Sequence, residues 1–209
     1  MEYIYRQQGF DFLNVVARGQ TYLNIIYLLL AFPLGLAYFI FLVVGLSLGV
    51  GLLIIWVGIP ILLLTLLGWW GCVLFERSLA NAFLDAHLSP LPPPVARDVS
   101  LWERLRSHLA NPLTWKGLIF LIAKFPLGLL SFITVVVLSS VTGGMLSAPF
   151  VYDEPLNYMD FGVGVVDTMG EAILIALLGV IVGILSLHLM NLLAQVWAKF
   201  TEYMLTPTP

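Results

Sequence analysis

Charged residues are scarce in this chain of 209 residues, in which Asp, Glu, Lys and Arg together make up 10%, against about 25% in soluble proteins. Apolar residues make up 60%, and the mean hydropathy is +1.00. A soluble domain of this size buries only roughly 70% of the surface of its unfolded chain, so it cannot hide that much apolar area. The composition therefore predicts an integral membrane protein.

Other features that the sequence lacks exclude several kinds of function. Cys72 is the single cysteine, which excludes an internal disulfide and a multi-cysteine metal site. The net charge of −3 argues against binding to nucleic acid. The three histidines lie in separate segments without paired ligand spacing, and no hydrolase, kinase or phosphate-binding motif occurs. We therefore expect no catalysis, no cofactor and no metal.

The longest apolar segment covers residues 25–75, which are 51 positions without Asp, Glu, Lys, Arg, His, Asn or Gln. A helix needs about 20 residues to cross a hydrocarbon core roughly 30 Å thick, so this segment predicts two spans. Glycines within residues 45–51 favour a break there, which gives spans near 23–45 and 50–73. Residues 76–86 then extend the second span as a cytoplasmic helix.

Two further spans follow near residues 117–141 and 172–196. Eight of the nine Lys and Arg residues precede the first span, separate the second from the third, or follow the fourth. The loop at residues 142–171 has no basic residue but five acidic ones. Because short basic loops stay cytoplasmic, both termini are predicted in the cytoplasm and the acidic loop outside.

The first and third spans are alike in sequence. Residues 21–48 and 114–141 align with 13 identities in 28 positions, whereas the second and fourth spans align poorly. Repeats of two spans each have the same orientation in the membrane. The predicted fold is therefore an all-α integral membrane protein with four transmembrane helices in two parallel two-helix repeats, and with short interfacial helices on the cytoplasmic side.

A Phe-Pro-Leu-Gly motif stands at the centre of both aligned spans. Its candidate packing or hinge residues are Phe32, Pro33, Gly35, Phe125, Pro126 and Gly128. Proline removes a helical hydrogen bond and kinks the helix, and a small residue lets another helix approach closely. We interpret the motif as a packing device between the repeats, with a hinge that transmits motion as the alternative.

The repeats divide the chain into residues 1–87, a proline-rich linker at 88–98, and residues 99–209. Ser100 and Glu103 form a capping-box pattern that predicts an amphipathic helix over residues 100–110 on the inner membrane surface. Asn111 and Pro112 end this helix and begin the next, since proline suits the first helical position. A weaker amphipathic pattern precedes the first span.

Two ionisable residues, Lys124 and His188, fall inside the predicted spans at similar depth near the inner leaflet. Ionisable groups within a membrane are candidates for function. We therefore consider a polar cluster of Lys124, His188 and Asn191 that serves signalling or proton sensing. The interpretation that we favour is that the lysine extends its amine to the headgroups and that these residues serve packing alone.

The loop after the third span combines acidic and aromatic residues. Its candidate external contact residues are Tyr152, Asp153, Glu154, Tyr158 and Asp160. Such a loop suits the reception of a cation, a peptide or a neighbouring protein. It would equally serve as a solvated connector that covers the ends of the spans.

The sequence resembles the bacterial and archaeal "putative sensor" membrane domain over nearly its whole length. The segments that carry the resemblance are 27–35, 45–60, 76–81, 102–106, 111–112 and 115–117, followed by the second Phe-Pro-Leu-Gly. In that family the four-span domain usually precedes a histidine kinase or another cytoplasmic output module. The resemblance therefore implies reception of a signal at or in the membrane, and it supplies no ligand-binding residues.

The present sequence has only a short tail after its fourth span, without a kinase or DNA-binding module. We therefore expect a non-catalytic sensor or regulatory module in a prokaryotic plasma membrane that acts on a separate protein, such as a histidine kinase. The alternatives are an accessory subunit of a larger membrane complex and, less favoured, a transporter of small solutes. The lipid bilayer is the expected surrounding, and a homo-oligomer is a further expectation.

Overall fold

The computed structural model describes residues 14–86, 88, 110–152 and 168–206, and all regular secondary structure in these residues is helical. Its elements in chain order are α1 (Asn14–Ala17), α2 (Gly19–Gly51), the 3₁₀ turn η1 (Leu53–Ile55), α3 (Gly58–Phe83), α5 (Pro112–Val151) and α6 (Met169–Leu205). The expected all-α class is thus confirmed. The predicted linker at 88–98 apart from residue 88, the predicted interfacial helix at 100–110 apart from residue 110, and residues 153–167 of the acidic loop lie outside the described residues.

Four of the helices, α2, α3, α5 and α6, are long and apolar enough to cross a membrane, as the hydropathy pattern predicted. They have 33, 26, 40 and 37 residues, respectively. A 40-residue helix is about 60 Å long, roughly twice the thickness of a hydrocarbon core. The helices therefore exceed the predicted spans, because helical structure continues beyond the purely apolar residues.

Side chains cap the first turns of the second pair of helices. The Asn111 side chain accepts a hydrogen bond from the Leu113 N–H, and Pro112 is the first residue of α5, as predicted from the sequence. At α6, Thr168 and Glu171 form a reciprocal capping box that the sequence analysis did not identify. These caps fix where α5 and α6 begin.

The break between the first two spans lies later than predicted. Helix α2 continues through all three glycines to Gly51, and the chain turns over Leu52 to Val57. A Cβ atom on Gly45 would lie 2.5 Å from the Thr65 hydroxyl, and one on Gly49 would lie 2.5 Å from the Leu62 side chain. These two glycines therefore let α3 approach α2 closely instead of ending the helix.

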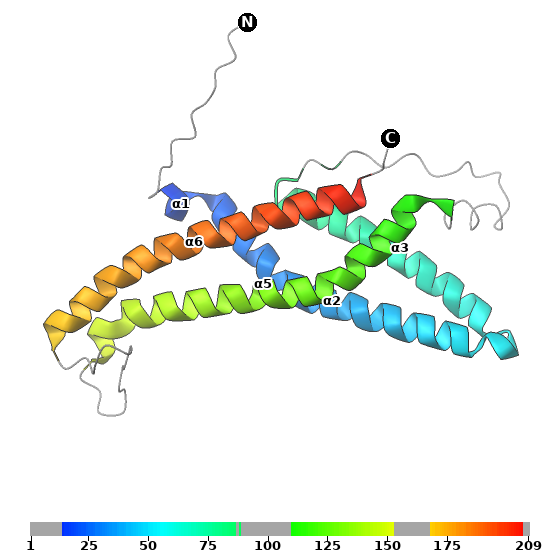
Figure 1. Cartoon of the computed structure of the whole chain (residues 1–209), viewed down its shortest axis with the longest axis horizontal. Helices are drawn as coiled ribbons and strands as arrows, with labels where there is room; N and C mark the ends of the chain where they lie inside the picture. Colours follow the sequence, from blue (N-terminus) through cyan, green and yellow to red (C-terminus); the bar gives the residue numbers. More distant parts are fainter. Residues whose placement is uncertain (1–13, 87, 89–109, 153–167, 207–209) are drawn as a thin grey trace, which may run out of the picture.

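The helices form two hairpins, α2–α3 and α5–α6, that cross near the middle of the molecule and slope away from each other (Figure 1). The connecting ends of the two hairpins lie at opposite ends of the view. The start of α2, the end of α3, the start of α5 and the end of α6 lie on the upper side (Figure 1). The main core cluster, which includes Tyr27, Leu28, Phe120 and Leu121, lies where the hairpins meet.

Burial repeats from one hairpin to the other. Eight of the nine buried residues of α2 have buried counterparts in α5 at the shift of 93: Thr21, Asn24, Tyr27, Leu28, Ala31, Gly35, Tyr38 and Leu42 pair with Thr114, Gly117, Phe120, Leu121, Lys124, Gly128, Ser131 and Val135. Six of the seven buried residues of α3 have counterparts in α6 at a shift of 121: Gly58, Thr65, Trp69, Val73, Glu76 and Ala80 pair with Gly179, Ser186, Met190, Ala194, Trp197 and Thr201. The second and fourth spans thus share a burial pattern although their residue identities differ.

Candidate functional site: a buried ion pair at the helix crossing

Lys124 of α5 forms an ion pair with Glu76 of α3, and both side chains are 0% exposed. The lysine therefore does not extend to the headgroups, which was one of the two expectations. It turns inward because a carboxylate on the neighbouring hairpin neutralises its charge, and a buried charge is tolerated only when it is paired and hydrogen-bonded.

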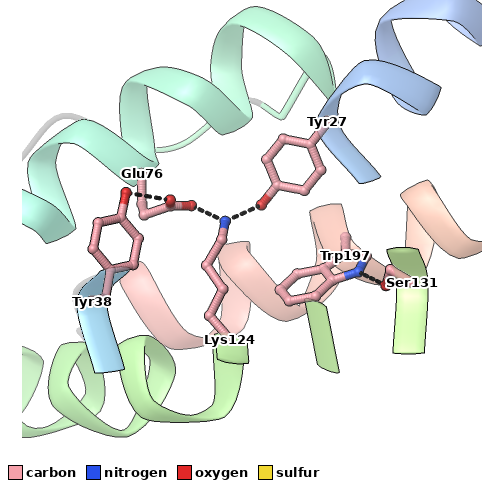
Figure 2. A network of polar contacts seen from close by, with 6 residues as sticks. All are labelled: Tyr27, Tyr38, Glu76, Lys124, Ser131 and Trp197. Atoms are coloured by element: carbon pink, nitrogen blue, oxygen red, sulfur yellow. Dashed lines mark hydrogen bonds and ion pairs between the residues drawn. The ribbon is translucent and has the colours of Figure 1, made fainter. Parts of the chain in front are cut away.

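Two tyrosines of α2 complete the hydrogen bonding of this pair (Figure 2). The Tyr38 hydroxyl donates to Glu76 Oε1 at 2.8 Å, and Lys124 Nζ donates to the Tyr27 hydroxyl at 3.2 Å. Both oxygens of the carboxylate thus have donors, one from α2 and one from α5. Three helices of the two hairpins are joined at one buried point.

Aromatic rings surround the ammonium group of Lys124. Its Nζ lies 4.7 Å from the ring centroid of Tyr27, 5.8 Å from that of Phe120 and 5.4 Å from that of Trp197. A cation over an aromatic face is attracted by the ring quadrupole, and this attraction is strongest where water is excluded. The rings therefore add to the stabilisation of the charge by Glu76.

The fourth helix joins the site through a neutral pair. Trp197 of α6 donates its Nε1–H to the Ser131 hydroxyl of α5 at 2.8 Å (Figure 2). Ser131 is the counterpart of Tyr38 at the shift of 93, and Trp197 is the counterpart of Glu76 at the shift of 121. The two hairpins thus place one polar pair at corresponding positions, Tyr38–Glu76 and Ser131–Trp197, and of these two pairs only the first contains a charged residue.

Ser131→Ala is expected to lower the free energy of unfolding by about 1–3 kcal/mol, because it leaves the buried indole N–H without its acceptor. Thr134→Ala is the matched control, since Thr134 is half-buried on the same helix and its hydroxyl donates to the Leu130 carbonyl one turn before it. Chemical unfolding in mixed micelles measures both variants. Equal losses in the two would contradict a specific role for the Trp197–Ser131 bond.

The residue after Glu76 reaches a different helix. The guanidinium of Arg77 donates a hydrogen bond to the carbonyl oxygen of Leu205, the last residue of α6. Arg77 is buried although it is charged. A carbonyl at a helix C-terminus lacks an intrahelical partner, and a cation there also interacts favourably with the helix dipole. Two successive residues of α3 therefore bind two other helices: Glu76 binds α5 and Arg77 binds the end of α6.

Asn191 lies in a separate hydrogen-bond network between α2 and α6. Its side chain accepts from Asn24 Nδ2 at 2.8 Å and donates to the Thr21 hydroxyl at 3.0 Å. Gln20 extends this network to Asn24 and to the Phe83 carbonyl. The predicted cluster of Lys124, His188 and Asn191 is thus divided, with the lysine paired to Glu76 and the asparagine bonded to α2.

His188 is half-buried on α6. The residues of the acidic loop proposed as external contacts are beyond the described part of the chain except Tyr152, which follows α5 and is half-buried. A role in signalling or proton sensing for Lys124, His188 and Asn191 stays a prediction.

The two Phe-Pro-Leu-Gly motifs contact each other at the crossing of α2 and α5. A Cβ atom on Gly35 would lie 2.7 Å from the Lys124 carbonyl oxygen, and one on Gly128 would lie 2.5 Å from the Ala31 carbonyl oxygen. Ala31 and Lys124 are themselves counterparts at the shift of 93, so the contact is reciprocal. The glycines therefore allow the backbones of the two hairpins to touch.

The phenylalanines of the motifs also contact one another. Phe32 and Phe125 stack with ring centroids 6.3 Å apart, and each also contacts a phenylalanine further along the opposite helix, Phe132 or Phe39. These contacts support the interpretation of the motif as a packing device. They place the crossing directly beside Lys124, which precedes Phe125 in the chain.

Sequence reasoning missed the partners of Lys124. Glu76 is the first charged residue after the apolar segment at 25–75, and Lys124 is the one charge within the third span. Opposite charges that each border or interrupt an apolar span are a signal of pairing, because either alone would be costly in lipid. Tyr27 and Tyr38 were identifiable only as the two tyrosines within that apolar segment.

The fold and the site define a multi-pass, all-α membrane protein whose two hairpins are locked by a buried ion pair, and the described residues contain no group of three or more His, Cys, Asp or Glu side chains that could hold a metal ion. The model of the family described as "Putative sensor" matches residues 27–205. The chain belongs to this family. Neither the curated proteins nor the solved structures include a match to it.

Proposed function

We propose that this chain is a non-catalytic sensor or regulatory module, which passes a signal from the membrane or from outside to a separate protein partner. Its family supports a sensor-type membrane module. The observation that carries the proposal is the pair of successive residues Glu76 and Arg77. Glu76 binds Lys124 at the helix crossing, and Arg77 binds the last carbonyl of α6.

The ion pair has the properties of a two-state element. When closed, it satisfies both buried charges, but any shift of α3 along α5 would leave them unpaired at a cost of several kcal/mol, roughly 3–5. The helices would therefore favour discrete arrangements over a continuous range. A signal that opens the pair would move α3, and with it the end of α6 held by Arg77.

The charge distribution supports a cytoplasmic output. Among the described residues, Arg18, Lys116 and Lys199 lie near the start of α2, the start of α5 and the end of α6, which share one side of the molecule (Figure 1). The basic side of a membrane protein faces the cytoplasm. We therefore propose a prokaryotic plasma membrane with both termini inside and the partner at that face.

The test uses a photo-crosslinking residue at Tyr203, which is 73% exposed near the end of α6. Crosslinking in the native host is compared between the wild type and a variant without the ion pair, Glu76→Leu with Lys124→Met. A sensor is expected to change its crosslinking yield to the partner at Tyr203 several-fold when the pair is removed. A crosslinker at Leu174, which is exposed near the start of α6, is the control and should report no change.

An accessory subunit gives a different result. It would copurify in fixed stoichiometry with a large membrane complex, and its crosslinks at Tyr203 would not respond to removal of the ion pair. That outcome would refute the sensor proposal and support the structural role.

A further inference from the structure

The turn between α2 and α3 ends in an exposed segment, Leu53–Val57, that contains only apolar side chains and is called the tip below. Ile54 is 88% exposed and Trp56 is 78% exposed, and the other tip residues are exposed as well. Connections between helices in water are normally polar. The tip instead lies in the middle of the segment 25–75, which contains no charged or amide side chain.

Part of the backbone of the turn is hydrogen-bonded within the turn itself. The N–H groups of Leu52, Ile55 and Trp56 donate to carbonyls three or four residues earlier, and the Gly58 N–H donates to the Leu52 carbonyl at 3.0 Å. In hydrocarbon an unsatisfied backbone group costs several kcal/mol, so only a segment with internal hydrogen bonds can lie there. Within the tip, the N–H groups of Ile55 and Trp56 meet this requirement through bonds inside the turn.

Trp56 occupies a backbone conformation that is unfavourable for its side chain. Its φ is 64°, in the left-handed region, which costs an L-residue about 1–2 kcal/mol and is usually filled by glycine. Gly58 stands two residues away. Strained backbone positions cluster at functional sites, and tryptophan is enriched where the hydrocarbon meets the headgroups.

The length of the apolar helix is compatible with a tip that stays within the membrane. Residues 25–51 of α2 form an apolar helix of about 40 Å, against a core of roughly 30 Å. Tilting by about 40° removes this mismatch and keeps the tip in lipid. The hairpins slope away from each other in the structure, as such tilting would require (Figure 1).

We propose that the tip is a lipid anchor: it inserts Ile54 and Trp56 into the leaflet opposite the basic ends of the helices. Its partner is the acyl-chain and headgroup boundary of that leaflet, not an aqueous ligand. The tip of the α5–α6 hairpin differs, because its connection carries four acidic residues, Asp153, Glu154, Asp160 and Asp167. The proposed anchor thus belongs to one hairpin, since the sequence that joins α5 to α6 is acidic where the α2–α3 tip is apolar. This inference does not depend on a signalling role.

The test places a nitroxide label at position 54 in the full chain with Cys72→Ala, reconstituted in phosphatidylcholine vesicles. Ile54→Cys is compared with two reference positions in the same background. Leu130→Cys is the lipid reference, because Leu130 is 62% exposed on α5, and Met169→Cys is the water reference beside Glu171. Thermal unfolding first confirms that each labelled variant retains the fold.

The label at position 54 is expected to resemble the lipid reference. The measured quantity is the ratio of its collision rate with oxygen to its collision rate with a water-soluble nickel chelate. This ratio should be several-fold higher at position 54 than at position 169. Accessibility to the nickel chelate equal to that at position 169 would overturn the proposal. Protection from both reagents would also overturn it, because a protein surface or a second copy would then cover the tip.

Discussion

Replacing Glu76 with leucine is expected to lower the free energy of unfolding by about 3–5 kcal/mol, because Lys124 then stays fully buried without a counter-charge. Replacing Lys124 with methionine should cost a similar amount, since it leaves the carboxylate unpaired. Both residues are 0% exposed and lie among aromatic rings, so water cannot replace the missing partner. Reversible unfolding in mixed micelles or bicelles measures these losses.

The double variant is the decisive control. Glu76→Leu with Lys124→Met removes both charges and retains similar volumes, and exchange of a buried ion pair for apolar residues is often neutral. We expect it to recover most of the loss, to within about 2 kcal/mol of the wild type, with the remainder due to the unsatisfied tyrosine hydroxyls. Additive losses in the double variant would show that the two charges do not depend on each other.

Alanine at Gly35 or Gly128 is expected to lower the free energy of unfolding by about 1–3 kcal/mol, and by more in the double variant. Each new Cβ atom would lie within 2.7 Å of a backbone oxygen of the opposite hairpin. A side chain can move aside, but a helix backbone cannot yield without separating α2 from α5. That separation would also disturb the contacts of Lys124, whose carbonyl is the atom opposite Gly35.

Gly143→Ala provides the matched comparison for this crossing. Gly143 is on α5 as well, but nothing lies within 4 Å of the position its Cβ would take. Alanine is the better helix former by about 1 kcal/mol, so this variant should be as stable as the wild type or more stable. If alanine at Gly35 and Gly128 were tolerated equally well, the close crossing would be refuted. Unfolding of all three variants under one condition gives the comparison.

Composition and hydropathy were sufficient to predict the helical class and the four spans, because in lipid the backbone must satisfy its own hydrogen bonds and an apolar segment of sufficient length forms a helix. The same reasoning placed the turn of the first hairpin among the glycines at 45–51, which was wrong. Glycine serves both to end helices and to let them approach. Only the neighbouring Thr65 and Leu62 decide that Gly45 and Gly49 do the latter.

The sequence repeat was detectable only in the first and third spans, where Phe-Pro-Leu-Gly is conserved between the halves of the chain itself. In the second and fourth spans, burial recurs at corresponding positions while the side chains change, as with Glu76 and Trp197. Two helices that pack at corresponding positions can carry a carboxylate in one repeat and an indole in the other, if the residue that contacts this side chain changes as well. An alignment by residue identity therefore does not detect that the second and fourth spans correspond.

By itself, the sequence determined that the chain is helical, that four segments can cross a membrane, and that Lys124 is an unusual charge within one of them. Only the tertiary structure decided that this lysine pairs with Glu76 while Asn191 bonds to α2. Hydropathy and periodicity act along one helix, and the crossing angle of two hairpins brings together residues 48 positions apart. The packing of the helices therefore determines which charged residues form a pair. That packing depends jointly on helix length, on small residues and on the positions of the aromatic rings.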